Sequence, residues 1–226
     1  MTTSLVAITH ELSEGSNDRL MNDVCAARFK ERVMPRITNR SLILCEGFNH
    51  DALVGPKHPK YDFTRNFLFG DALGSITPTF GGFDPRHTPS AEESNMIAAM
   101  YDEWQSTVMR IIRLDTSTIR IPVGVGEVVE AIRRGGPSVE LDRRPTQRQV
   151  ALAAAIRDTN KMFDRRYLDA IRAYSRKFDT CLFVGGASHV VSMALKRAYP
   201  IIDLTSPEDA QSIFFTCLSD RWVRHP

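Results

Sequence analysis

The feature that most constrains the fold is a pair of short apolar segments separated by a helical pattern, all within the first 47 residues. Residues 4–9 and 41–45 are apolar on both faces, as expected of strands buried on both sides of a sheet. Between them, apolar side chains recur at helical spacing up to about residue 33. Parallel strands need a long crossover, which is usually a helix. The sequence therefore predicts a parallel βαβ unit at the start of an α/β protein.

The same pattern returns near the end of the sequence. Residues 181–184 and 200–204 are two more strand candidates, and each is followed by a predicted helix. Ser206 and Pro207 supply the cap and first-turn proline of the last helix. Since no linker is long enough to separate two domains, we expect one domain over residues 1–226. Its central sheet should be mostly parallel or mixed, with flanking helices.

The middle of the chain is predicted to be largely helical. Capping boxes at Ser90–Glu93 and Thr146–Gln149 predict helices that extend to about residues 113 and 178. The second of these is either one long helix or two nearly collinear helices. Residues 117–123 alternate like a strand, and 127–134 form a short predicted helix that Gly135 and Gly136 close.

Residues 48–89 are predicted to be an irregular segment, because glycine and proline recur throughout it. A loop of this length inside a domain is often a lid or a binding loop. Its several aromatic side chains indicate packing against the rest of the protein. A substrate lid and a cover for one sheet edge both remain open.

Composition limits the partners and the compartment. The formal charge is +2, from 29 basic and 27 acidic residues, which argues against a nucleic-acid partner. A local basic group is read as a solvated surface, with contact to an anionic partner as the alternative; it comprises Arg133, Arg134, Arg143, Arg144 and Arg148. No apolar run is long enough for a membrane span, and the first residues do not resemble a signal peptide. Four cysteines without a CxxC pair suggest buried thiols. We therefore expect a cytoplasmic protein with no membrane partner.

Two histidines and one glutamate follow apolar strands in the same way. His10 and His189 each come just after a strand candidate and before a helix, and Glu46 ends the strand at 41–45. Parallel strands bring their carboxyl ends to one sheet edge, where ligands bind. Imidazoles and a carboxylate suit a divalent transition metal or acid–base catalysis. Although a single such histidine is more often a cap or a surface residue, the matched placement makes His10, Glu46 and His189 the candidate catalytic and metal-binding set.

A polar pair in the long helix adds two candidates. Asn160 interrupts the apolar stripe, so we expect it to be buried and hydrogen-bonded. Arg157 lies three residues earlier on a neighbouring part of the same surface. Asn160 is either structural or points to the strand-end cluster, where Arg157 would hold an anionic group of a substrate.

The glycine turn before His189 offers a further use. Gly185, Gly186 and Ser188 lie between a strand and a helix, an arrangement that can cradle a phosphate. The turn is not a complete nucleotide-binding motif, and the sequence has no GxSxG elbow. These three residues are therefore cofactor-binding candidates.

Four segments together resemble the superfamily of TIKI metalloproteases, TraB/PrgY proteins, erythromycin-esterase-like hydrolases and ChaN haem-binding proteins. Residues 7–10 resemble its first G-x-x-H motif, with Ala7 in place of glycine, and 186–189 match the second. Residues 41–46 resemble the strand that ends in the family glutamate, and 157–160 resemble its R-[ND] helix segment. The resemblance implies pseudo-repeated βα halves with both histidines and the glutamate facing one cleft. For the TIKI branch it also implies a divalent metal and hydrolysis.

Three functions remain open at this point. The first is a metal-assisted hydrolase of ester or amide bonds in a small-molecule or peptide substrate. In it, His10, Glu46 and His189 bind the metal or activate water, Arg157 stabilises the oxyanion and Asn160 orients a ligand. The second is a non-catalytic binder of a small anionic ligand, nucleotide or haem in the same cleft. The third is an interaction protein that keeps only the fold.

Overall fold

The computed structural model describes residues 2–9, 21, 23–49, 53–69, 73–83, 90–114, 120–136 and 139–224. Its strands are β1 (Thr2–Ile8), β2 (Ser41–Asn49), β3 (Thr79–Phe83), β4 (Ile112–Leu114), β5 (Val139–Leu141), β6 (Thr180–Gly186) and β7 (Ile201–Asp203). Its α-helices are α1 (Asp23–Arg32), α2 (Tyr61–Phe69), α3 (Ala91–Thr107), α4 (Val125–Arg133), α5 (Gln147–Tyr174), α6 (Ala187–Lys196) and α7 (Pro207–Arg224). Short 3-10 turns follow α1, α3 and α5, at Met34–Arg36, Met109–Ile111 and Ser175–Lys177.

A five-stranded parallel sheet organises the fold, in the order β3-β2-β6-β1-β7. All four predicted strands near 4–9, 41–45, 181–184 and 200–204 belong to it, so the predicted single-domain α/β fold is confirmed. The central strand β6 has β1 on one side and β2 on the other. The β4 and β5 strands form a separate antiparallel pair.

The sheet is buried on both faces, which explains why its strands are apolar throughout. On one face, Ala7, Leu44 and Phe183 pack against α5, α6 and α7. On the other face, Ile8 and Val184 join Phe29 of α1 and the aromatic side chains of α2. Alternate residues of a strand point to opposite faces, and here both sets meet a layer of helices.

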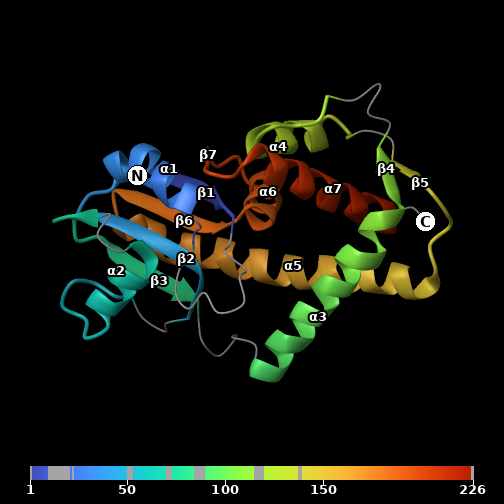
Figure 1. Cartoon of the computed structure of the whole chain (residues 1–226). Helices are drawn as coiled ribbons and strands as arrows, with labels where there is room; N and C mark the ends of the chain where they lie inside the picture. The colour runs from blue at the N-terminus through green and yellow to red at the C-terminus, as the bar shows by residue number, and fades with distance from the viewer. Residues whose placement is uncertain are drawn as a thin grey trace.

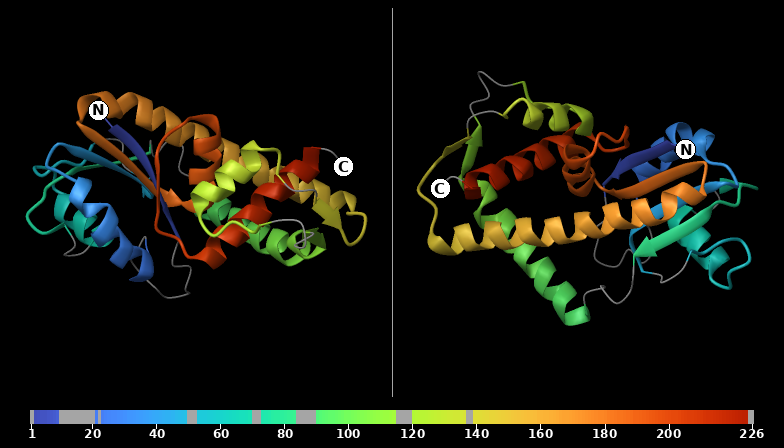
Figure 2. Two further views of the ribbon diagram at one scale, coloured as in Figure 1. Left: turned by 90° about the horizontal axis from the view of Figure 1, so that it is seen from above. Right: turned by 180° about the vertical axis from the view of Figure 1, so that it is seen from behind.

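Helix α5 joins the two parts of the molecule. It runs along the sheet at its carboxyl end and reaches α3 at its amino end (Figure 1). The views from above and behind show α3, α4, α7 and the β4–β5 pair gathered beyond the sheet (Figure 2). A separate apolar cluster forms there, where Trp104 and Ile111 meet Ile156 of α5. The long helix thus connects the sheet's core to this helical core.

The capping boxes begin the two helices where the sequence places them. The Ser90 hydroxyl accepts the amide hydrogen of Glu93, and the Thr146 hydroxyl accepts that of Gln149. The second helix is a single one, α5, because Asn160 fits its hydrogen-bonded ladder. Gly135 and Gly136 both have positive φ, 106° and 62°, and close α4 as predicted.

The region 48–89 corrects the expectation of one irregular segment. Its described residues include helix α2 and the edge strand β3, which pairs in parallel with β2. The rings of Tyr61 and Phe80 pack here in a tilted arrangement, with 5.5 Å between their centroids, and the Tyr61 hydroxyl donates to the carbonyl of Pro78. The aromatic side chains that indicated packing therefore build a helix and a strand, despite the glycines and prolines around them.

The strand predicted at 117–123 also differs from the structure. Residues 120–123, the described part of the strand predicted at 117–123, are not in a strand, and β4 lies earlier, at Ile112–Leu114. Pro122 lacks the amide hydrogen that a strand ladder needs.

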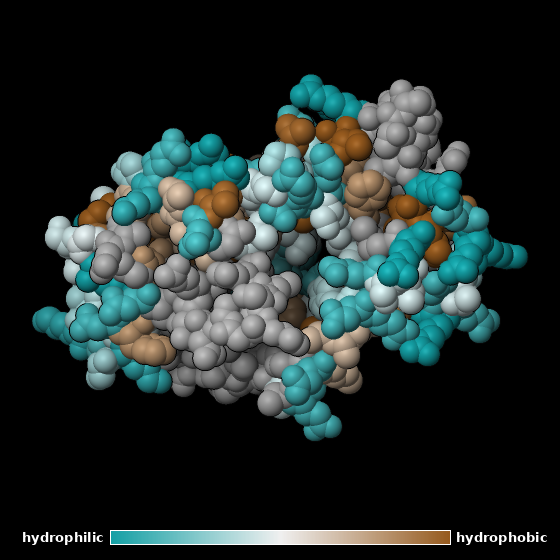
Figure 3. All heavy atoms as spheres, in the orientation of Figure 1, coloured by the Kyte–Doolittle hydropathy of each residue, from teal (hydrophilic) through white to brown (hydrophobic). Residues whose placement is uncertain are grey.

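In the view of Figure 3, hydrophilic side chains cover most of the coloured surface, and hydrophobic ones form small separate groups.

Candidate functional site

The candidate site lies where the three central strands end. Ile8 of β1 pairs with Gly186 of β6, and Cys45 of β2 pairs with Val184. The carboxyl ends of these neighbours therefore lie at one edge of the sheet. Glu46, which was predicted to end its strand, lies within β2, because the strand continues to Asn49.

The Glu46 carboxylate is held at the start of α6. The Gly186 amide donates a hydrogen bond of 2.5 Å to Oε2 of Glu46. The other oxygen, Oε1, lies 3.4 Å from Nε2 of His189. Gly186 is the N-cap of α6, so the carboxylate also meets the positive end of the helix dipole. These contacts leave Oε1 facing the imidazole.

His189 is in the first turn of α6, not in a turn before the helix, because β6 continues through Gly186. Its side chain is buried, with 8% of the residue exposed. Nδ1 lies 2.9 Å from Oδ1 of Asp164. The edges of Tyr167 and Phe163 pack against the ring at centroid distances of 5.2 and 6.1 Å. The imidazole is thus fixed, with Nδ1 toward Asp164 and Nε2 toward Glu46.

Asp164 is the residue that the sequence reasoning missed. It is fully buried on α5 and binds three groups of α6. Besides His189, the Ser192 hydroxyl donates to its Oδ2, as does Nζ of Lys196 at 2.9 Å. Asp164 follows Asn160 by four residues in the same apolar stripe. A carboxylate on a predicted inner helix face needs a partner, and this was the available signal.

The charges of the site reinforce one another. Burial alone would lower the pKa of His189, but the carboxylates of Glu46 and Asp164 outweigh it and raise the pKa above its ordinary value. Burial would raise the pKa of Asp164, but its hydrogen bond and attraction to His189 are stronger and lower it. Both pKa shifts favour an imidazolium between two carboxylates.

Two tyrosines extend the polar site. Burial, followed by the nearby charge of Glu46, raises the pKa of the Tyr167 hydroxyl. Tyr101 of α3 contributes to the same shift, and its hydroxyl donates a hydrogen bond to Oδ1 of Asn160. Asn160 is hydrogen-bonded as predicted, but it is half-buried rather than buried. Asn160 lies one turn before Asp164 on α5, so it is adjacent to the site. Its hydrogen bond with Tyr101 joins α5 to α3 at this point.

Arg157 forms an ion pair with the next residue in the chain, Asp158. Its Nε lies 3.0 Å from Oδ1 of Asp158, and its side chain is 19% exposed. Its role at an oxyanion stays a prediction.

The glycine turn is filled by protein atoms. A Cβ on Gly185 would lie 2.6 Å from Cζ of Phe183 and 2.8 Å from Oε2 of Glu46. Glycine is therefore required for the close approach of β6 to the carboxylate. The Gly186 amide, expected to face a phosphate, is used by Glu46. Ser188 is half-buried within α6, and its role as a ligand-binding residue stays a prediction.

The fit to a divalent metal depends on the donor set. The separation of 3.4 Å between Glu46 Oε1 and His189 Nε2 lets both atoms reach one ion at about 2.0–2.2 Å. Asp164 on Nδ1 is the outer partner that metal-binding histidines usually have. Within the described ranges, no group of three or more His, Cys, Asp or Glu side chains could hold a metal. His10, the third predicted ligand, lies outside the described residues.

Comparisons with known proteins add no family to this geometry. The chain matches no protein-family model, no curated protein and no solved structure.

In the part of the chain that the structure describes, no helix has the length and apolar character required to span a membrane. The four cysteines are free, and three of them are buried; these are Cys25, Cys45 and Cys181.

Proposed function

We propose that the chain is a hydrolase of ester or amide bonds, with Glu46 and His189 at its reacting centre. The observation that carries this proposal is the row Glu46–His189–Asp164, at the carboxyl edge of the central parallel strand. A buried histidine oriented by a buried carboxylate is a recurring arrangement in acyl-transfer enzymes. Here the reacting nitrogen faces a second carboxylate in place of a serine.

Glu46 and His189 have complementary roles in this reaction. Oε1 of Glu46 accepts a proton from a water molecule while the water oxygen bonds to the substrate carbonyl carbon. The raised pKa of His189 keeps a proton available on Nε2. That proton passes to the leaving oxygen or nitrogen as its bond to the carbonyl carbon breaks. Asp164 is a positioning residue, because it touches the imidazole and not the substrate.

A divalent metal belongs to the same proposal. Glu46 Oε1 and His189 Nε2 would hold it, with His10 as the expected third ligand. When bound, it would lower the pKa of a water ligand and polarise the carbonyl. His189 must then be neutral, because a metal and a proton compete for Nε2. Support for this version comes from the resemblance to the TIKI and TraB group, whose two histidines and glutamate correspond to these positions.

The experiment measures hydrolysis of aryl esters and peptide anilides by protein purified without a histidine tag. It is run after chelation and again after addition of Zn²⁺ or Mn²⁺, with bound metal measured by elemental analysis. Glu46→Gln keeps an acceptor for the Gly186 amide but removes the base, so kcat should fall by about 10²-fold or more. Glu130→Gln is the matched control, because Glu130 is exposed on α4 and pairs with Arg133.

The outcomes separate the versions of the proposal. Activity restored only by metal, together with loss of bound metal in Glu46→Gln, supports the metal version. Activity retained after chelation supports direct acid–base catalysis. Equal activity of Glu46→Gln and the wild type, or no hydrolysis under any condition, would overturn the proposal and favour a non-catalytic binder.

A further inference from the structure

A second polar site lies on the opposite side of Asp164 from His189. A pocket of about 670 Å³ opens between α5 and the end of α6. Seven residues of the described part of the chain line it, and five of them are cationic: Lys161, Arg165, Arg172, Lys196 and Arg197. The other two are Leu168 and Asp169. Its volume is within the range of small-molecule sites, which are usually more apolar than this one.

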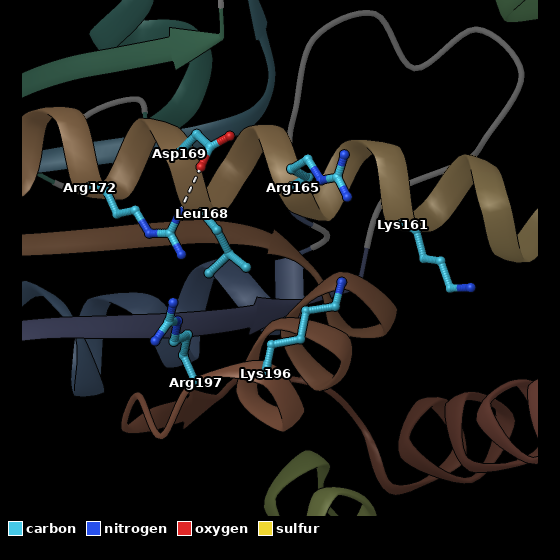
Figure 4. A pocket seen from close by; sticks show the side chains of 7 residues that line it. All are labelled: Lys161, Arg165, Leu168, Asp169, Arg172, Lys196 and Arg197. Carbon is cyan, nitrogen blue, oxygen red and sulfur yellow. Dashed lines mark hydrogen bonds and ion pairs between the residues drawn. The ribbon is translucent and has the colours of Figure 1, made fainter.

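Four of the five cations extend into the space between α5 and the end of α6, and the Arg165 side chain lies along α5 at its border (Figure 4). In Figure 4, the side chains of Lys161 and Arg172 extend from α5 toward α6. Those of Lys196, the last residue of α6, and Arg197, the residue after it, extend toward α5. Leu168 extends from α5 into the space between them. Groups placed on both sides of a space can contact one ligand together.

The carboxylates of this region do not neutralise all five cations. Lys161 is 3.6 Å from Asp158, and Arg172 is 3.0 Å from Asp169, both in exposed pairs. Exposed pairs of this kind are weak and can rearrange around a ligand. Among the residues that the structure describes, Arg165 and Arg197 have no ion-pair partner. An uncompensated positive charge therefore remains at the pocket.

Lys196 ties the pocket to the interior. Its Nζ is 2.9 Å from Oδ2 of Asp164, whose other oxygen holds His189. The lysine side chain is 40% exposed, whereas Asp164 is fully buried. A buried carboxylate thus fixes one ammonium group at the pocket wall and gives the site a rigid member.

We propose that this pocket binds a small phosphate-bearing anion, with Arg165 and Arg197 as its principal ligands and Lys196 as a fixed contact. Guanidinium groups bind phosphate oxygens in pairs of parallel hydrogen bonds. Among the described residues that line it, none has an aromatic side chain on which a base would stack. The site therefore selects a compact phosphate group rather than a nucleobase. This binding does not depend on hydrolysis at Glu46.

Calorimetry with inorganic pyrophosphate tests the proposal on the whole chain. The wild type should bind one equivalent, and the Arg165→Ala/Arg197→Ala variant should bind at least about tenfold more weakly, through loss of two charge-assisted contacts. The matched control is Arg143→Ala/Arg144→Ala, which removes the same charge from an exposed turn before α5. The control should bind as the wild type does. Thermal melting checks that both variants fold.

Four further ligands identify the chemistry. If a nucleoside triphosphate binds no more tightly than tripolyphosphate, the pocket recognises the phosphate groups alone. Tighter binding of the nucleotide would overturn the inference that the pocket does not bind a nucleobase. Citrate that binds as well as pyrophosphate would overturn selectivity for phosphate. Duplex DNA could also bind more tightly than pyrophosphate and lose affinity equally in both variants. That result would overturn the proposed phosphate pocket and show a diffuse basic surface instead. Absence of pyrophosphate binding to the wild type would also overturn it.

Discussion

Nδ1 of His189 and Oδ1 of Asp164 lie 2.9 Å apart, and the aspartate is fully buried. This contact joins α6, which follows the central strand, to α5, which spans both parts of the molecule. It orients the imidazole so that its second nitrogen faces Glu46. The same carboxylate accepts hydrogen bonds from Ser192 and Lys196. One side chain of α5 therefore sets the position of three groups on α6.

Asp164→Asn should destabilise the protein. The neutral amide removes the negative charge that faces His189 and Lys196. Its NH2 group cannot accept the hydrogen bonds that the replaced carboxylate oxygen accepted. Removing one partner of a buried ion pair costs about 3–5 kcal/mol, and the amide should recover part of that cost. Chemical denaturation measures the change in the free energy of unfolding.

Asp169→Asn is the control for this variant. Asp169 lies on the same helix and pairs with Arg172 at the surface. Its replacement should change the free energy of unfolding by less than about 1 kcal/mol. An equal decrease in the free energy of unfolding of the two variants would show that the buried contacts of Asp164 stabilise the protein no more than the surface pair does.

Gly185→Ala should be strongly destabilising although the substitution is small. The new Cβ would lie 2.6 Å from Cζ of Phe183, a buried ring, and 2.8 Å from Oε2 of Glu46. Overpacking of this kind costs about 1–3 kcal/mol. Gly126→Ala in α4 is the control, because no atom lies within 4 Å of its added Cβ. The control should gain about 0.5–1 kcal/mol, since alanine favours a helix. Equal thermal shifts of the two variants would contradict the steric argument.

The fold could be predicted further than the site. The apolar strands and capping boxes are local signals, and the sheet and the long helix follow from them. Glu46 and His189 were found because parallel strands must end together. Asp164 was not found, because its partner lies 25 residues away on another helix. The packing angle of α5 against α6 decides that contact, and no local pattern encodes it.

The glycine turn shows a second limit of sequence reasoning. Gly185 and Gly186 fit a phosphate cradle as a pattern, but the Glu46 carboxylate takes the Gly186 amide. Only the register of β2 against β6 brings that carboxylate within reach. Similarly, α2 and β3 form in a stretch rich in glycine and proline, because aromatic contacts such as Phe29–Phe69 stabilise them.

The stability should depend on pH through His189. Its pKa in the folded protein is raised above the ordinary value of 6.5. The imidazolium therefore contributes stability that is fully present below the unfolded pKa and is lost as the pH rises through the folded one. The free energy of unfolding should decrease over that interval in the wild type. His189→Gln, which does not titrate, should lack this decrease, and a parallel decrease in both proteins would assign it to other groups.

His189→Ala should reduce stability as well as activity. The histidine is buried beside Asp164, so alanine leaves a cavity and a carboxylate without its imidazole partner. Glutamine retains a polar side chain of similar length and is the better replacement for separating activity from stability.

The Tyr101–Asn160 contact tests whether Asn160 is structural. The Tyr101 hydroxyl of α3 donates to Oδ1 of Asn160 on α5, between the sheet and the helical cluster. Asn160→Leu leaves that hydroxyl without its acceptor, and Tyr101→Phe leaves the amide oxygen without its donor. Each single variant should lose about 1–3 kcal/mol, and the double variant should lose less than the sum, because the interaction disappears only once. Urea denaturation of the four proteins gives the coupling energy. A coupling near zero would show that the contact adds no stability, and activity lost in Asn160→Leu but retained in Tyr101→Phe would assign the amide to the substrate.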